Sequence, residues 1–137
     1  MFRFETNIRV RYAETDKMGF VYYGNYAAYY EVARVESLRS LGITYKSMEE
    51  SGIMLPVLEN FSKYILPAQY DDLITIAVML KEKPGTRIRF EYECYNQDKK
   101  LINLGYTILV FVDVKTGRPV ESPAHINEIL KPFFDAL

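Results

Sequence analysis

The chain has 137 residues, of which 49% are apolar and 26% charged, a composition typical of one folded globular domain. Its 17 basic and 18 acidic residues leave a net charge of −1, which argues against a surface built for broad attraction to nucleic acid. A single His125 and a single Cys94 exclude an internal disulfide and a Cys/His zinc site within one chain. We expect neither a metal nor a cofactor.

Residues 1–12 alternate strictly between apolar and polar side chains, which indicates a half-buried strand. The residues expected on its buried face are Phe2, Phe4, Ile8, Val10 and Tyr12. This alternation differs from the pattern of a signal peptide, and no run in the chain approaches the ~20 apolar residues of a membrane span. We therefore expect no membrane span and a cytoplasmic location.

A helical period follows from Gly24 to about Leu41. Asn25 is expected to cap its start, and Gly42 is expected to end it. Because residues 25–35 are apolar nearly all round, this long helix is expected to be buried on most sides.

The rest of the chain predicts a short helix, four strands and a terminal helix. The short helix is expected over 44–51, the strands over 55–66, 72–82, 87–96 and 101–113, and a helix interrupted near Pro132 over 124–135. Short turns between the last three strands indicate antiparallel neighbours. The last strand also carries Leu109 and Phe111 on its second face, which suggests an oligomer interface. These elements predict a single α+β domain over residues 1–137, with one curved five-stranded sheet around one long helix.

Candidate chemistry is concentrated in residues 13–23, a predicted loop that holds Glu14, Asp16 and Gly19. The first N–H groups of the following helix lack helical partners and carry partial positive charge, so they can hold a carbonyl oxygen as it becomes an oxyanion. Asp16 lies a few residues upstream, where a carboxylate can attack the same carbonyl or activate a water. On spacing alone, the more ordinary interpretation is an aspartate that only stabilises a turn.

The stretch from Arg11 to Tyr26 resembles the signature of hot-dog-fold acyl-CoA thioesterases of the 4-hydroxybenzoyl-CoA thioesterase type. The matching elements are a Thr-Asp-x-x-Gly-x-Val run at 15–21, the pair Asn25-Tyr26, and Tyr30-Glu31-x-x-Arg34. The resemblance in element order extends to Asp113. It implies the hot-dog fold, an acyl-CoA substrate, and a homo-oligomer, either a dimer or a dimer of dimers, with active sites at the dimer interface.

Carried over position by position, the resemblance places the catalytic carboxylate at Asp16, as nucleophile or general base. It places the backbone N–H that polarises the thioester carbonyl at Tyr23. The further substrate-binding positions that it implies are Gly19, Val21, Gly24, Asn25 and Tyr26. Many relatives have a His where this chain has Phe20 or Tyr23, so imidazole is not expected in the mechanism. Hydratase chemistry, which pairs an acidic residue with a His, is disfavoured because His125 is expected at the surface.

Several other residues have two interpretations. Glu31 is either a second catalytic carboxylate or, as we favour, the ion-pair partner of Arg34. The five tyrosines within residues 22–30 either line an acyl pocket or pack in the core and interface. The basic residues around a predicted turn either meet the phosphates of coenzyme A or form a solvated face; they are Lys81, Lys83, Arg87 and Arg89.

The remaining nucleophiles are weaker candidates. Cys94 is expected to face inward as a small core residue, and neither Ser62 nor Ser122 has an adjacent base, so a serine esterase is disfavoured. The sequence therefore predicts an acyl-CoA thioesterase that hydrolyses a fatty or aromatic acyl thioester to the free acid and thiol. The alternatives are a non-catalytic acyl-thioester binding protein of the same fold and an acyl-carrier-protein thioesterase. An isomerase on a cone-shaped α+β fold is disfavoured, because that fold usually begins with helices.

Overall fold

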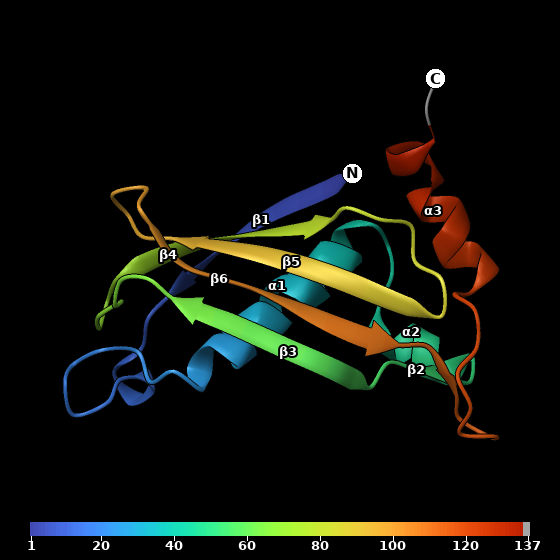
Figure 1. Cartoon of the computed structure of the whole chain (residues 1–137), viewed down its shortest axis with the longest axis horizontal. Helices are drawn as coiled ribbons and strands as arrows, with labels where there is room; N and C mark the ends of the chain where they lie inside the picture. The colour runs from blue at the N-terminus through green and yellow to red at the C-terminus, as the bar shows by residue number, and fades with distance from the viewer. Residues whose placement is uncertain (136–137) are drawn as a thin grey trace.

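Five antiparallel strands form one twisted sheet, and the long helix α1 lies across one of its faces (Figure 1). This computed structural model describes residues 1–135. Its elements in chain order are β1 (Phe2–Arg9), a 3-10 turn (Tyr12–Glu14), α1 (Asn25–Ser40), α2 (Tyr45–Glu50), β2 (Ile53–Met54), β3 (Val57–Tyr64), β4 (Leu73–Leu80), β5 (Arg87–Tyr95), β6 (Leu101–Val110), β7 (Val112–Asp113) and α3 (Ala124–Phe134). The strand order is β1-β4-β5-β6-β3, so β1 and β3 are the sheet edges, and β2 pairs separately with β7.

The predicted α+β arrangement is confirmed, and the core lies between α1 and the face of the sheet that we call the inner face. On this face β4 contributes four fully buried side chains, namely Ile74, Ile76, Val78 and Leu80. Strand β5 alternates as its sequence predicted and buries Ile88, Phe90, Tyr92 and Cys94. The strict alternation of β5 and the apolar run of β4 therefore supply much of the apolar inner face of the sheet.

Strand β6 turns the more polar of its two faces toward α1. Its register with β5 places on the inner face Asn103, Gly105, Thr107 and Leu109. The half-buried residues on the outer face are Leu104, Tyr106, Ile108 and Val110. Leu109 and Phe111, which we expected at an oligomer interface, instead belong to the core of the chain itself. Alternation defines two faces of a strand, but it does not say which one the helix covers.

Helix α1 buries only one side within the chain, so the prediction of burial on most sides is wrong for a single copy. Its exposed side includes Ala27, Ala28 and Val32. The predicted cap is also wrong, because Gly24 holds the cap position and the Asn25 amide donates to the carbonyl oxygen of Glu14 at 2.8 Å. The amide therefore ties the helix to the preceding loop instead of capping it.

Three further expectations have clear outcomes. Helix α1 ends as predicted before Gly42, whose φ of 82° suits glycine. Tyr12 is not part of a buried strand face, because β1 ends at Arg9 and the Tyr12 side chain on the 3-10 turn is 77% exposed. Helix α3 continues through Pro132 and is not interrupted there. Among residues 1–135, none of the helices is long and apolar enough to cross a membrane.

Candidate active site

Asp16 stands at the start of a tight turn that a bridge between Thr15 and Val21 closes. The Asp16 N–H donates to the carbonyl oxygen of Phe20 at 2.8 Å, and Gly19 adopts a φ of 81° that a side chain would strain. The Asp16 Oδ1 atom accepts from the N–H groups of Met18 at 2.9 Å and Phe20 at 3.2 Å. Its other oxygen, Oδ2, accepts no hydrogen bond from any described residue. The turn thus holds the carboxylate by one oxygen and leaves the other available.

The N-terminus of α1 presents unpaired backbone donors close to this turn. The N–H of Asn25 donates to the carbonyl oxygen of Tyr22, and the N–H of Tyr26 donates to the carbonyl oxygen of Tyr23. The N–H groups of Tyr23 and Gly24 have no partner within residues 1–135. Among the residues that the structure describes, no side chain caps the helix. An unpaired N–H at a helix start attracts a partially negative oxygen.

The carboxylate and the helix start open on one hollow of about 350 Å³. It is lined by Asp16, Met18, Phe20, Val21, Tyr23, Tyr26, Tyr64, Ile65, Leu66 and Pro67. Most of these side chains are apolar or aromatic, so the hollow suits an apolar group held beside one carboxylate. The lining residues come from the loop and the helix start, and from the end of β3 with the residues after it. The loop and the end of β3 lie at the same end of the sheet (Figure 1).

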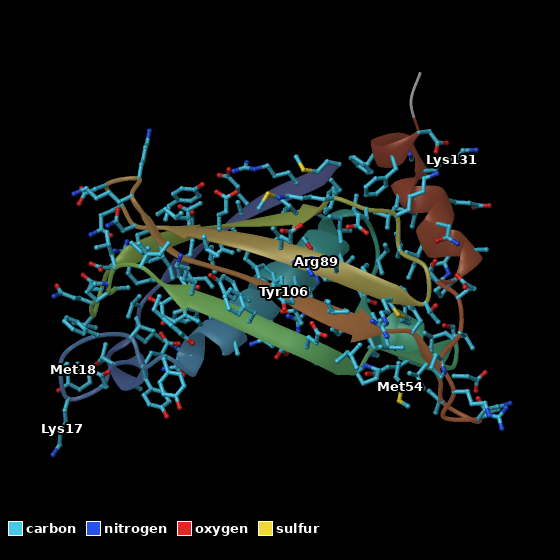
Figure 2. All side chains as sticks on the ribbon, in the orientation of Figure 1. Lys17, Met18, Met54, Arg89, Tyr106 and Lys131 are labelled. Carbon is cyan, nitrogen blue, oxygen red and sulfur yellow. The ribbon has the colours of Figure 1, made fainter. Side chains whose placement is uncertain are left out.

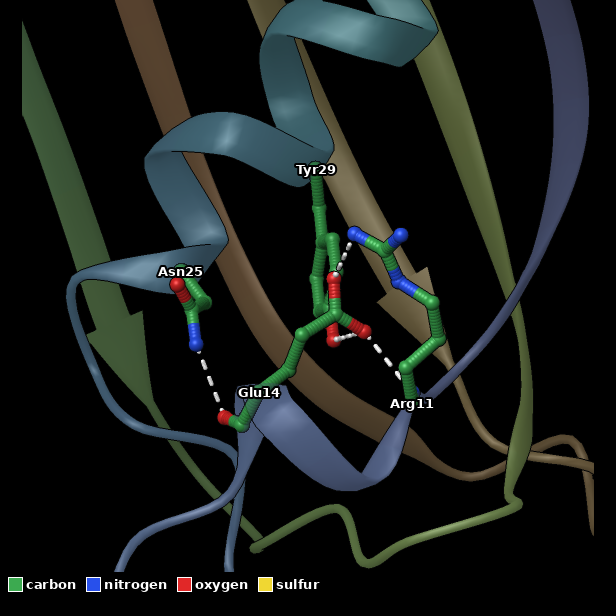
Figure 3. A network of polar contacts seen from close by, with 4 residues as sticks. All are labelled: Arg11, Glu14, Asn25 and Tyr29. Carbon is green, nitrogen blue, oxygen red and sulfur yellow. Dashed lines mark hydrogen bonds and ion pairs between the residues drawn. The ribbon is translucent and has the colours of Figure 1, made fainter.

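A network around Glu14 fixes the loop on α1 (Figure 3). Glu14 Oε1 accepts from the Arg11 N–H at 2.7 Å and from the Tyr29 hydroxyl at 2.9 Å, while Oε2 accepts from the Arg11 guanidinium at 3.1 Å. The Glu14 carbonyl oxygen accepts from Asn25 and from the N–H of Tyr22. Burial acts to raise the pKa of Glu14, but the hydrogen bonds from Arg11 and Tyr29 outweigh it and lower that pKa overall. Glu14 thus acts as an anchor of the loop.

Four of the seven predicted site residues line the hollow itself, namely Asp16, Val21, Tyr23 and Tyr26. Gly19 lies with Asp16 on a neighbouring, more polar hollow of about 490 Å³. Gly24 and Asn25 line neither hollow, and they shape the helix start instead. Of the five clustered tyrosines, Tyr23 and Tyr26 face the hollow, Tyr29 and Tyr30 are buried, and Tyr22 is exposed.

The predicted ion pair between Glu31 and Arg34 is wrong. Glu31 is exposed, and the buried Arg34 guanidinium donates to the hydroxyls of Tyr45 and Tyr92, each at 3.1 Å. No carboxylate within the described part of the chain forms an ion pair with Arg34. The hydroxyl oxygens of Tyr45 and Tyr92 therefore accept the hydrogen bonds of Arg34 that we expected a carboxylate to accept.

The other candidate residues lie away from Asp16. The β4–β5 turn, which carries the basic cluster of Lys81 to Arg89, is at the opposite end of the sheet from the loop (Figure 1). Within the cluster Lys83 pairs with Asp135, and Arg89 lies over the Tyr106 ring on the outer face (Figure 2). His125 is exposed on α3 as expected. Sequence reasoning missed Tyr64 and residues 65–67, since they are far from Asp16 in the chain and carry no local motif.

Comparison with known proteins supplies the family. The profile of the thioesterase-like superfamily matches residues 10–130. The protein YneP of Bacillus subtilis is 32% identical over 114 residues, which cover 83% of each chain. The acyl-CoA thioester hydrolase YbgC of Escherichia coli is 30% identical over 90% of this chain and 92% of its own. The solved structure of a DHNA-CoA thioesterase from Staphylococcus aureus is 30% identical, with a TM-score of 0.90, and the match covers 100% of this chain and 98% of that one.

These matches confirm the predicted fold and enzyme class. The superposition over the full chain identifies the arrangement of α1 on its five-stranded sheet as the hot-dog fold. The family match spans the turn at Asp16, the helix start at Tyr23 and strand β3. The chain therefore belongs to the thioesterase-like superfamily and is a thioester hydrolase.

Proposed function

We propose that this protein hydrolyses acyl-CoA thioesters with Asp16 as nucleophile or general base and the backbone N–H of Tyr23 as oxyanion donor. The observation that carries the proposal is that two residues with unused groups line one apolar hollow: Asp16, whose Oδ2 accepts no hydrogen bond from residues 1–135, and Tyr23, whose N–H has no partner among them. The acyl-CoA substrate is supported by the name of the YbgC relative, an acyl-CoA thioester hydrolase.

In this mechanism the thioester carbonyl oxygen accepts a hydrogen bond from Tyr23, with the N–H of Gly24 beside it. The donor polarises the carbonyl and stabilises the negative charge that develops on its oxygen. Asp16 Oδ2 then either bonds to the carbonyl carbon, giving a mixed anhydride that water cleaves, or takes a proton from the water that attacks. In both routes the carbon–sulfur bond breaks, the thiolate leaves and is protonated, and the carboxylic acid is released.

A homodimer completes the site in this proposal. Strand β3 is an uncovered sheet edge, and its exposed apolar side chains include Val57, Leu58, Phe61 and Tyr64. The apolar side of α1 at Ala27, Ala28 and Val32 is likewise exposed. Edges of this kind are normally covered, and a second copy pairing along β3 would cover this one. Because Tyr64 belongs both to the edge and to the hollow, such pairing places the site at the interface.

The test is release of free thiol from a panel of short, long and aromatic acyl-CoA esters. Asp16→Asn keeps the size and the turn hydrogen bonds of the side chain, and it should lower kcat by about 10² to 10⁴. Asp98→Asn, at an exposed position in another turn, is the matched control and should retain full activity. An undiminished Asp16→Asn enzyme contradicts the mechanism. Binding without turnover would favour the non-catalytic alternative. Turnover of acyl-carrier-protein esters, but not of coenzyme A esters, would identify the carrier protein as the natural thiol carrier.

A further inference from the structure

We propose that Tyr64 ends the acyl pocket and thereby limits the length of the acyl group; this inference rests on the proposed function. Tyr64 is the last residue of β3 and lies on the inner side of that strand, in register with Asn103 of β6. Its ring centroid lies 5.7 Å from that of Tyr26 and 6.3 Å from that of Tyr23, both in edge-to-face geometry. Three rings from the helix start and the sheet edge thus pack together in the lining of the hollow.

The inner face of the sheet beside Tyr64 is polar. Asn103 is fully buried, and its Oδ1 atom accepts from the hydroxyl of Tyr30 and from that of Ser62, the latter at 3.5 Å. Its amide nitrogen has no partner within residues 1–135. Farther along the same two strands Thr107 donates to Asn60 at 2.9 Å. An alkyl chain that passed Tyr64 would lie against hydroxyls and an unpaired amide, where it gains little from leaving water.

The part of the hollow that a single chain forms is small. Its volume of about 350 Å³ is near the lower end of the ~300 to 1,000 Å³ range of small-molecule pockets. Each methylene that enters an apolar pocket improves binding by up to about fourfold. That gain should continue until the chain reaches Tyr64 and then stop. The accepted group is therefore a compact acyl group, either a short chain or a single flat ring.

Tyr64 is suited to a test because its side chain is 53% exposed, so its removal leaves the core in place. Tyr64→Ala deletes the ring, and Tyr64→Phe keeps the ring and removes only the hydroxyl. The straight-chain acyl-CoA series from acetyl to palmitoyl is assayed with the wild type and both variants for kcat/KM. The dissociation constants of the same series are measured calorimetrically on an Asp16→Asn background, so that length preference is observed without turnover.

The wild type and Tyr64→Phe should share one optimum at short length in both measurements. Tyr64→Ala should move the optimum to longer chains, with a gain of about tenfold for two added methylenes relative to acetyl-CoA. An unchanged length profile in Tyr64→Ala, or a wild type that takes palmitoyl as well as butyryl, overturns the proposal. Length-limited binding without any turnover would support the role of Tyr64 while overturning the hydrolytic mechanism.

Discussion

The hydroxyl of Tyr29 donates a hydrogen bond of 2.9 Å to Oε1 of Glu14, and so a buried residue of α1 holds the loop that carries Asp16 (Figure 3). Tyr29 is 3% exposed, and Glu14 lies two residues before Asp16 in the chain. The bond crosses from the first turns of the helix to the 3-10 turn of the loop. The position of the proposed catalytic carboxylate relative to the helix start therefore depends on a residue with no chemical role of its own.

Replacing Glu14 with Gln should weaken this anchor in a pH-dependent way. The folded state lowers the pKa of Glu14 below its ordinary value of 4.5, so the charged form stabilises the fold above that pH. This stabilisation is lost as the pH falls through the lowered pKa of the folded state. At pH 7 the variant should be less stable by about 1 kcal/mol, because the side chain of its partner Arg11 is largely exposed.

Urea unfolding between pH 7 and pH 3 measures this effect, and the gap between wild type and Glu14→Gln should narrow below pH 4.5. The rate of thioester hydrolysis at pH 7 should also fall, since the loop loses a charged contact. Asp98→Asn serves again as a control that removes an exposed carboxylate. A stability gap that stays constant from pH 7 to pH 3 would show that the charge of Glu14 contributes nothing.

A backbone donor is tested by substitution with proline, which has no N–H. Tyr23→Pro removes the unpaired donor at the start of α1, and proline is tolerated just before a helix. The expected loss in kcat is about 10² to 10³, the usual effect of one oxyanion donor. Tyr23→Phe keeps the donor and the ring, so it should retain nearly full activity. Equal rates for the two variants would remove the Tyr23 N–H from the mechanism.

Much of the fold and part of the candidate site follow from the sequence, because the signals that define them are local. Alternation in β5 and the helical period of α1 gave the correct elements, and Asp16 and Tyr23 lie within one short segment. The side of β6 that faces α1 was not predictable, since Leu109 and Leu104 are equally apolar and only packing distinguishes them. Tyr64 reaches the hollow through the pairing of β3 with β6, a long-range contact that no local pattern encodes.

The error at Arg34 has a similar origin and leads to another prediction. Spacing along the helix suggested Glu31 as its partner, whereas the fold brings two phenols from α2 and β5. Tyr92 in turn donates to Thr107, which continues the chain of hydrogen bonds toward β3. Arg34→Ala leaves a cavity and unpaired hydroxyls and should destabilise the protein by about 3 kcal/mol.

Arg34→Met fills most of the same space without a charge, so in urea unfolding it should be more stable than Arg34→Ala by about 1 to 2 kcal/mol. Both variants should retain the hydrolytic mechanism, because Arg34 does not line the hollow. If Met destabilises the protein as much as Ala does, hydrogen bonding at this residue dominates over packing.

The proposed dimer can be tested at Phe61, near the middle of β3 and 44% exposed. In an antiparallel pairing of two copies along this strand, the middle of one β3 meets the middle of the other. Phe61→Lys would bring two positive charges together at an edge, which disfavours pairing. Val114→Lys places the same charge at an exposed position outside β3 and is the matched control.

In gel filtration we expect the wild type and Val114→Lys as dimers and Phe61→Lys as a single chain. Because the hollow borders the same strand, the single chain should also lose most of its hydrolytic activity, and a fully active monomer would contradict a site that needs two copies.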